Sequence, residues 1–526
     1  MVTITVHSAG RRTAISVLPG SNLLDVLRRG DFGVYSPCGG EGTCGKCLAG
    51  IREREHSDRR LVTSCMYTVD RDIEVNLPDT AEIEVLASQY ERLRKLPPEP
   101  GTAAAVGYAT AIEVGSPSTH FPDPATPIGA AIDLGTTTIV AHLADLKSGS
   151  LIETRTARNP QAAFGADVIA RIHHCMTAKN GLGTLRSLVI ATINRLISES
   201  AASQGLRTTD VVRVTVAGNT TMLHILLGEH PEPLAFTPFQ PVFTGRRHVA
   251  AAALGLSMHP RAEVHVLPSF SAYVGADVVA GLAALDPEST PETYLFVDVG
   301  TNGELALVTP DRILCCATAA GPAFEGANLA CGMEAGAGAI CRYRGPDDIQ
   351  TIANMPPVGI CGSGLVDIVA SLLRRGVIGV DGFLAEPAVI VPAARAGRDI
   401  LLTPGDMREV QLAKSAIAAG VALLLRHAGC RPDDIGAVYL AGGMGNYLQP
   451  RSAVDIGLFP RELEKKIIPV GNTSASGALL ALKSEQFGAC LDEILSRMEL
   501  FELSGHPEFL DEFAGNMAFP HPPIQP

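Results

Sequence analysis

The chain has 526 residues, of which 46% are hydrophobic, so it is long enough to form more than one domain with sizeable cores. Asp and Glu number 55 against 42 Lys and Arg, a formal net charge of -13 that argues against nucleic acid or an anionic membrane as partner. The first residues alternate like a strand and lack the pattern of a signal peptide, and no stretch of about 20 apolar residues follows. These features predict a cytoplasmic protein.

The first 88 residues predict a small unit built mainly from strands. Alternation predicts two paired strands, at residues 2–8 and 13–19, and a closing strand at residues 72–78. Amphipathic spacing predicts a short helix at residues 22–29. Residues 89–126 are rich in Pro, Ala and Ser, a composition typical of an extended linker.

A cysteine-rich loop, SPCGGEGTCGKCLAG, lies within the N-terminal unit at residues 36–50. Cys38, Cys44 and Cys47 have the spacing C-x5-C-x2-C, and Cys65 follows in LVTSCMY. Four thiolates can bind a 2Fe-2S cluster, and the glycines between them expose N–H groups to the bridging sulfurs. A structural zinc site is the alternative, because C-x2-C with two outlying cysteines also satisfies zinc. The glycine density and the neighbouring strands favour the iron-sulfur cluster.

From Pro127 onward, apolar strands alternate with helical runs, which is the pattern of an α/β fold. We expect strands within residues 128–135, 211–219, 294–308 and 437–445. We expect helices within residues 184–202 and 410–429.

Two stretches of this region repeat the order strand, Asp, Gly, Thr and returning strand. AIDLGTTTIV and FVDVGTNGELAL place Asp133 and Asp298 at matching positions, which predicts a duplicated fold with a central cleft and a second half beginning near residue 292. Gly lets backbone N–H groups approach phosphate, Thr hydroxyls donate, and Asp can hold Mg²⁺ through water. The predicted nucleotide-binding residues are Asp133, Gly135, Thr136 and Thr137, with Asp298, Gly300, Thr301, Asn302 and Gly303.

Two further stretches are rich in glycine. VYLAGGMGNYL ends an apolar strand at Gly442 and Gly443, where bare backbone can lie against a flat adenosine. GICGSGLVDIVASLL, residues 359–373, opens a helix whose N-terminus can attract an anionic group. Tight packing of a helix on a strand is the equally weighted alternative for this second stretch.

Together these motifs resemble those of the reductive activators of corrinoid proteins, in which a ferredoxin-like 2Fe-2S domain is joined to an ATPase of the actin, sugar-kinase and heat-shock-chaperone superfamily. CGGEGTCGKC is similar to the cluster loop, the two Asp-Gly-Thr stretches to the phosphate motifs, and LAGGMGNYL to the adenosine motif. The similarity extends through NPQAAFGADVIARI, VTVAGNTTMLHILLG, PSFSAYVGADVVAG, AAGPAFEGANLACGM and HPEFLDEFAGNMAFP.

The resemblance implies a domain plan. An N-terminal β-grasp, ferredoxin-like domain would occupy residues 1–88, with the linker at 89–126. A duplicated, ribonuclease-H-like ATPase domain of the actin and sugar-kinase type would occupy residues 127–526. Some members carry a middle domain between linker and ATPase, and residues 91–126 are too few to hold one.

The resemblance also implies a function. It implies an ATP-dependent reductive activase that passes one electron from the 2Fe-2S cluster to the Co(II) corrinoid of a methyltransferase-system corrinoid protein, restoring Co(I). The implied cofactors are the cluster, ATP and Mg²⁺, with Asp298 orienting the attacking water and Asp133 holding the metal. An upstream donor would reduce the cluster, and a homodimer is a candidate assembly.

Two other functions remain open. A small-molecule kinase with a regulatory iron-sulfur domain would need a phosphoacceptor pocket with a catalytic carboxylate, which the sequence does not locate. An electron-transfer module whose ATPase-like half serves only for docking would not need both Asp-Gly-Thr motifs, and both are retained.

Overall fold

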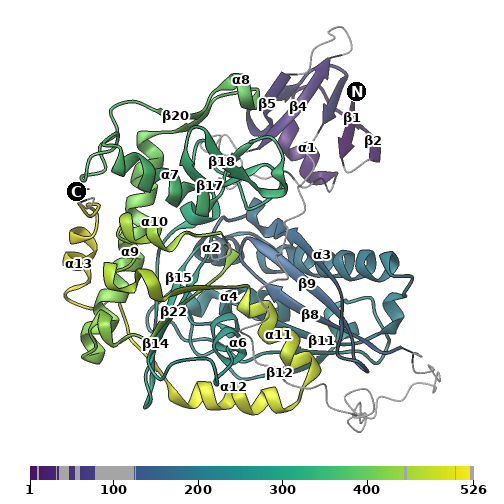
Figure 1. Cartoon of the computed structure of the whole chain (residues 1–526). Helices are drawn as coiled ribbons and strands as arrows, with labels where there is room; N and C mark the ends of the chain where they lie inside the picture. The colour runs from purple at the N-terminus through teal and green to yellow at the C-terminus, as the bar shows by residue number, and fades with distance from the viewer. Residues whose placement is uncertain are drawn as a thin grey trace.

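The structure is a computed structural model that describes residues 1–8, 11–30, 32, 34, 47–53, 60–76, 124, 126–443, 447–503 and 505–521. The chain is a mixed α/β protein with three principal sheets, one in the N-terminal unit and two in the region after residue 127 (Figure 1). None of the helices in these residues is long and apolar enough to cross a membrane. The predicted linker lies almost entirely outside the described residues.

The N-terminal unit is a five-stranded mixed sheet with one helix. Its strands, in spatial order, are β2 (Arg11–Val17), β1 (Val2–Ser8), β7 (Ile73–Asn76), β4 (Leu48–Glu53) and β5 (Arg60–Thr63). β1 runs antiparallel to β2 and parallel to β7, while β4 runs antiparallel to both of its neighbours. A two-stranded pair, β3 (Ser21–Asn22) and β6 (Thr68–Val69), lies beside it. The paired strands and the closing strand predicted from alternation are confirmed.

Helix α1 (Leu23–Arg29) fills one face of this unit. It begins where the Asn22 side chain accepts hydrogen bonds from the backbone nitrogens of Leu24, at 3.0 Å, and Asp25. Its leucines are buried in one core with residues of β1, β4 and β7. Arg28 and Arg29 occupy its last turn, where positive charge is favourable to the helix dipole.

Five strands of each large sheet share one order and one set of directions. In the first, β10 (Leu151–Arg158), β9 (Thr138–Asp145) and β8 (Ile128–Leu134) form an antiparallel meander, and β11 (Val211–Gly218) and β13 (Glu263–Val266) add in parallel to β8. In the second, β16 (Ile313–Thr318), β15 (Gly303–Val308) and β14 (Tyr294–Val299) form the meander, and β22 (Ala437–Ala441) and β23 (Ile467–Gly471) add in parallel. Asp133 and Asp298 lie near the ends of the corresponding strands β8 and β14.

Short strands extend this framework. β12 (Arg247–Ala250) and β24 (Met498–Leu500) each lie at an edge of a large sheet. Two small sheets are formed by β17 (Ala339–Gly345), β18 (Asp348–Thr351) and β19 (Gly359–Ile360), and by β20 (Ala388–Val391) and β21 (Ile400–Leu402).

Helices cover the faces of the two large sheets (Figure 1). Those that precede the second large sheet in sequence are α2 (Val168–Thr177), α3 (Gly181–Ser203), α4 (Thr220–Leu227), α5 (Ala251–Leu254) and α6 (Ala276–Ala284). Those that follow are α7 (Gly362–Arg374), α8 (Ala393–Ala396), α9 (Pro404–Ala428), α10 (Pro450–Asp455), α11 (Thr473–Lys483), α12 (Gln486–Arg497) and α13 (Phe509–Gly515). The two helical runs predicted from the sequence lie in the long helices α3 and α9, with Gly429, the last residue of the second run, as the C-cap of α9.

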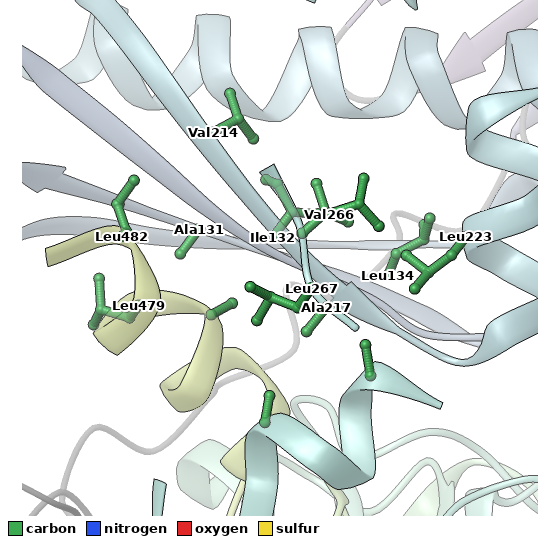
Figure 2. Close-up of a cluster of buried hydrophobic side chains, with 14 of the residues drawn as sticks. Ala131, Ile132, Leu134, Val214, Ala217, Leu223, Val266, Leu267, Leu479 and Leu482 are labelled. Atoms are coloured by element: carbon green, nitrogen blue, oxygen red, sulfur yellow. The ribbon is translucent and has the colours of Figure 1, made fainter. Parts of the chain in front are cut away.

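Helix α11 comes late in the chain but packs on the first large sheet. Leu479 and Leu482 of this helix lie in the same buried cluster as Ala131 of β8 and Val214 of β11 (Figure 2). The hydroxyl of Thr215 in β11 also donates a 2.7 Å hydrogen bond to the carbonyl oxygen of Ala478. We call residues 128–284, from β8 to α6, the first lobe, and the chain from β14 onward the second lobe. The core of the first lobe is therefore completed by residues near the C-terminal end.

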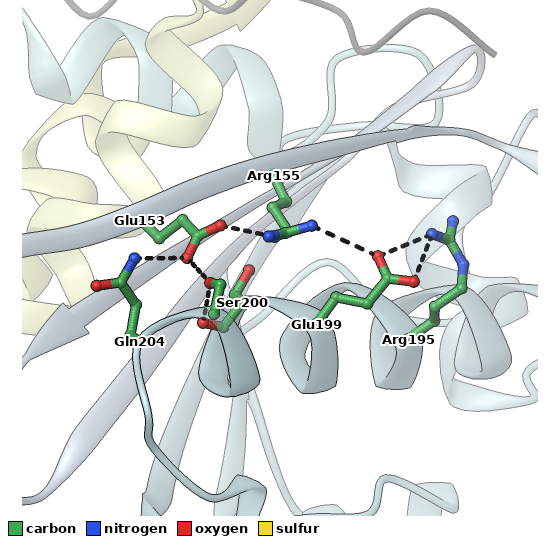
Figure 3. Close-up of polar contacts among 7 residues, drawn as sticks. Glu153, Arg155, Arg195, Glu199, Ser200 and Gln204 are labelled. Atoms are coloured by element: carbon green, nitrogen blue, oxygen red, sulfur yellow. Dashed lines mark hydrogen bonds and ion pairs between the residues drawn. The ribbon is translucent and has the colours of Figure 1, made fainter. Parts of the chain in front are cut away.

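A polar network fastens edge strand β10 to helix α3 (Figure 3). Glu153 of β10 pairs with Arg155 at 2.7 Å and accepts a 3.0 Å hydrogen bond from Gln204. Arg155 lies 3.8 Å from Glu199, which also pairs with Arg195. Because these side chains keep part of their exposure to water, each pair contributes about 1 kcal/mol or less, and the network's main effect is to hold the edge strand in place.

Candidate functional site

The turn that follows β8 and the turn that follows β14 lie against each other. The hydroxyl oxygens of Thr137 in the first lobe and Thr301 in the second are 3.4 Å apart. Glu325, at the end of the short 3₁₀ turn Pro322–Glu325, accepts hydrogen bonds from both hydroxyls through Oε2, at 3.1 Å from Thr137. The two Gly-Thr turns predicted from the sequence repeat are thus brought together, joined by a glutamate that sequence reasoning missed.

The first turn is held from within its own lobe. Asn219 donates to the Thr136 hydroxyl at 2.8 Å, and Asn159 donates to the Gly135 carbonyl at 2.9 Å. The guanidinium of Arg171, which is fully buried, donates to the Thr136 carbonyl at 2.5 Å. Thr136 is buried beneath the turn while Thr137 keeps partial exposure, so Thr137 is the better placed of the two hydroxyls to meet a ligand.

Asp133 is held by the start of helix α11. Its Oδ2 accepts a hydrogen bond from Asn472 and its Oδ1 accepts one from Ser474, both at 2.7 Å. Asn472 also caps the helix, because its Oδ1 accepts from the backbone nitrogen of Ala475 at 2.8 Å. These donors hold the Asp133 carboxylate in one orientation.

Asn219 and Asn472 occupy equivalent joints between a strand and a helix. Asn219 follows Gly218 at the end of β11 and caps α4, while Asn472 follows Gly471 at the end of β23 and caps α11. Both joints read Gly-Asn-Thr in the sequence, in VAGNTT and PVGNTS. This Gly-Asn-Thr repeat is the sequence signal that marks both asparagines.

Gly442 brings the predicted adenosine motif against Asp298. It follows β22, whose last residue pairs with Asp298 of β14, and its backbone nitrogen donates to the Gly471 carbonyl at 3.1 Å. Its φ is +87°, and a Cβ added there would lie 2.7 Å from Asp298 Oδ1. Gly443 has no neighbouring atom within 4 Å of an added Cβ. The backbone at Gly442 is therefore closely packed, whereas Gly443 faces open space.

These two glycines support a matched pair of variants. We expect Gly442→Ala to lower the free energy of unfolding by about 1–3 kcal/mol, because alanine is strained at this φ and its Cβ would displace Asp298. Gly443→Ala should leave stability unchanged, because no atom lies within 4 Å of the added Cβ. Urea denaturation of the two variants measures the difference. Equal stability loss in both variants would contradict this packing argument.

Six carboxyl groups with partial exposure gather around the meeting point of the turns. They are Asp133, Asp277, Asp298, Glu304, Glu325 and Glu334. Desolvation raises the pKa of Asp298 to about 8, with repulsion from the Asp277, Asp133 and Glu325 carboxylates adding to the rise. Desolvation and the Asp133 charge raise the pKa of Asp277, on α6, to about 7. A bound cation would reduce the electrostatic repulsion among these carboxylates.

The carboxyl groups do not form a ready-made metal cage. In the part of the chain that the structure describes, no three His, Cys, Asp or Glu side chains are grouped closely enough to hold a metal ion. Mg²⁺ commonly keeps several waters and is bound through one or two carboxylates together with substrate phosphates. The arrangement suits a hydrated Mg²⁺ that arrives with a nucleotide.

The raised pKa of Asp298 predicts a pH dependence of stability. An aspartate in the unfolded chain titrates near pH 4, whereas Asp298 in the folded chain titrates at about 8, so the folded state binds more protons between these values. Stability without metal or nucleotide should therefore fall as the pH rises from about 4 to about 8. Circular dichroism melts at pH 6 and pH 8.5 measure this. Asp298→Asn should flatten the dependence, and an unchanged slope would contradict the assignment.

Two of the four predicted cluster cysteines lie in contact. Cys47 is buried just before β4, Cys65 is buried after β5, and the backbone nitrogen of Cys65 donates to the Cys47 sulfur at 3.4 Å. Asn22 also donates to the Cys65 carbonyl at 2.7 Å. Cys38 and Cys44 fall outside the described residues. The Cys47–Cys65 contact fits a cluster site, since N–H donors to ligand sulfurs tune iron-sulfur centres.

The glycine-rich start of α7 serves packing. A Cβ added at Gly362 would collide with the Phe324 carbonyl, and one at Gly364 would collide with the Ile340 carbonyl. Of the two interpretations weighed from the sequence, close packing of helix on strand is the one observed here. This packing also positions the 3₁₀ turn that carries Glu325.

The two similar large sheets and their paired Gly-Thr turns define a class of protein. Comparison with known proteins identifies this class. Residues 292–526 match the profile of the C-terminal domain of RACo, described as the ASKHA domain, which is the actin and sugar-kinase class. Residues 128–289 match the profile of the RACo middle region. The chain belongs to the RACo family, the reductive activators of corrinoid proteins. The stretch matched by this second profile contains the first of the two large sheets, β8 to β13.

Individual relatives agree with this assignment. The chain is 29% identical to "Corrinoid activation enzyme RamQ" of Eubacterium limosum over 92% of this chain and 93% of that protein. It is 28% identical to "[Co(II) methylated amine-specific corrinoid protein] reductase" of Methanosarcina barkeri over 66% and 68% of the two chains. The chain is also similar to a solved structure titled "Reductive activator for corrinoid,iron-sulfur protein", with a TM-score of 0.72 and 29% identity. The alignment covers 99% of each of the two chains.

Proposed function

We propose that this protein is an ATP-dependent reductive activase that transfers one electron to the Co(II) corrinoid of a partner protein and restores Co(I). The observation that carries the proposal is the meeting of two Gly-Thr turns at Glu325, whose charge acts on Asp298 together with that of Asp133. Family membership supports a corrinoid protein as the substrate, since the relatives named above act on corrinoid proteins. The partner would be the corrinoid protein of a methyltransferase system.

The electron would come from a 2Fe-2S cluster held by Cys38, Cys44, Cys47 and Cys65. Such a cluster, when bound, supplies a one-electron donor at moderate potential. The buried Cys47 and Cys65 and the N–H···S contact between them support this assignment. A β-grasp, ferredoxin-like fold of the N-terminal unit is part of the proposal, supported by its mixed five-stranded sheet and single helix.

ATP would lie between the two turns, with its phosphates near Thr137 and Thr301 and its base near Gly443. Asp133, oriented by Asn472 and Ser474, would hold hydrated Mg²⁺, and Asp298 would orient the attacking water. The shared strand order of the two large sheets supports an origin by duplication, which explains why each lobe supplies one Asp-Gly-Thr turn.

The nucleotide is needed because reduction to Co(I) is energetically uphill from a ferredoxin-type cluster. For one electron, about 59 mV corresponds to about 1.4 kcal/mol, so a gap of a few hundred millivolts costs roughly 5–7 kcal/mol. ATP binding and hydrolysis can offset this only if the protein binds the partner's states with different affinities.

The test is whether the partner controls the nucleotide reaction. ATP hydrolysis by the purified protein should accelerate when an oxidised corrinoid protein is added, and affinity for the partner should depend on cobalt state and nucleotide. Equal affinity for the Co(II) and Co(I) forms, with and without ATP, would remove the thermodynamic basis of the mechanism. Phosphorylation of a small molecule instead would favour a kinase.

A further inference from the structure

One short segment of the first lobe, residues 159–165, contacts three parts of the molecule. It follows edge strand β10 directly, and it begins with the 3₁₀ turn Pro160–Ala163 capped by Asn159. Asn159 and Gln161 are almost fully buried although they are polar. We call this segment the junction.

The junction touches the N-terminal unit through Arg28. The guanidinium of Arg28, in the last turn of α1, donates a 3.0 Å hydrogen bond to the Ala163 carbonyl. The same guanidinium lies 6.0 Å from the centre of the Phe164 ring, within the range of a cation–π contact. An arginine of the proposed cluster-bearing unit therefore contacts the junction through a hydrogen bond and a cation–π contact.

The junction also holds the first phosphate turn by two routes. Asn159 donates to the Gly135 carbonyl at 2.9 Å, and its own backbone nitrogen donates to the Thr137 carbonyl at 2.7 Å. Gln161 accepts a 3.0 Å hydrogen bond from Arg171, whose other nitrogen donates to the Thr136 carbonyl. All three carbonyls of the turn are thus bound by the junction or by Arg171.

Arg171 ties the far end of the junction to the same turn. Its Nε donates to the Gly165 carbonyl at 3.1 Å, so one buried guanidinium spans Gly165, Gln161 and the turn. Breaking any of these contacts would leave buried polar groups unpaired, which is costly. The segment and the turn should consequently move as one body.

On the side facing the second lobe, the residue before the junction forms an ion pair. Arg158 at the end of β10 lies 2.7 Å from Glu334. Desolvation and the Glu334 charge both raise the pKa of Glu325, which bridges the two Thr hydroxyls. The junction therefore lies where the N-terminal unit, the first turn and the second lobe meet.

From this connectivity we propose that the junction couples the docking of the N-terminal unit to nucleotide binding, with Arg28 as the positioning residue on the docking side. The proposal rests on the function proposed above, in which the turn binds ATP. With Arg28 docked, the turn carbonyls stay fixed and the turn is preorganised for phosphate, which lowers the cost of binding. Because coupling between two sites is reciprocal, ATP must in turn strengthen docking.

The test uses the full chain and a non-hydrolysable ATP analogue with Mg²⁺. Arg28→Ala removes the contact, Arg28→Lys keeps a donor to Ala163, and Arg29→Ala is the control because Arg29 is an exposed arginine in the same helical turn. We measure the dissociation constant of the analogue and its effect on hydrogen exchange in residues 23–29 and 132–138.

In the wild type and in Arg29→Ala, the analogue should slow exchange in both segments. In Arg28→Ala it should still slow exchange in 132–138 but leave 23–29 unchanged, and its dissociation constant should rise about fivefold, near the lower end of typical couplings. Arg28→Lys should retain part of the response.

Two results would overturn the coupling. The first is an analogue that protects 132–138 in the wild type while leaving 23–29 unaffected, and the second is equal affinity in Arg28→Ala and Arg29→Ala. Both leave the proposed nucleotide site standing. Absence of any binding or protection in the wild type would overturn the nucleotide site together with the coupling.

Discussion

Replacing Asp298 by Asn should slow ATP hydrolysis by about two to four orders of magnitude, the range of a positioned acid–base group, while leaving nucleotide binding intact. Because burial and neighbouring carboxylates raise the pKa of Asp298 to about 8, the neutral amide resembles the form that predominates at pH 7 without metal. The variant should therefore fold normally. Corrinoid reduction should fall in proportion to hydrolysis, and chemical reduction of the cluster should stay normal. Steady-state phosphate release and nucleotide titration measure the two effects.

The control for this variant is Asp311→Asn, the same chemical change at an exposed position between β15 and β16 of the second lobe. It should leave hydrolysis unchanged. If Asp298→Asn hydrolysed ATP and activated the corrinoid protein at the original rate, Asp298 would not be the water-orienting group. Glu325, held between the two turns, would then be the next carboxylate to test.

The second large effect is expected at Cys47. Anaerobically isolated wild-type protein should contain about two irons and two acid-labile sulfides per chain. Cys47→Ser should lose or damage this cluster and reduce electron transfer to background, because the serine removes a buried sulfur that accepts the Cys65 N–H bond. Iron and sulfide analysis with visible spectroscopy measures the loss. Nucleotide binding should persist, since the turns lie in other sheets and Arg28, which contacts the junction, is unchanged.

Cys430→Ser is the matched control, because Cys430 lies beyond α9 in the second lobe and is only half-buried. It should keep the full cluster content. A stoichiometric zinc content without visible absorption in the wild type would contradict the iron-sulfur assignment and support the zinc alternative.

The sequence carried most of the information about local structure. Strands and helices followed from alternation and amphipathic spacing, because those patterns reflect which face of each element is buried. The repeated Asp-Gly-Thr order predicted that two turns would work together, and Thr137 and Thr301 do lie 3.4 Å apart.

Contacts between distant parts of the chain could not be predicted in the same way. Glu325 meets Thr137 across nearly two hundred residues, and Asn472 reaches Asp133 across still more. Periodicity describes one element at a time and contains no information on how two lobes face each other. Asp277 was missed for the same reason, because its effect on Asp298 depends on where α6 lies against β14.

The position of α11 has a consequence for how the chain folds during synthesis. Leu479 and Leu482 share a buried cluster with Ala131 and Val214, so part of the first large sheet stays uncovered until residues 473–483 leave the ribosome. A nascent chain that stops after the first lobe would expose that apolar face to water. Both lobes should then complete their folding together near the end of translation. Chaperones would bind the uncovered apolar surface until the last helices pack on it.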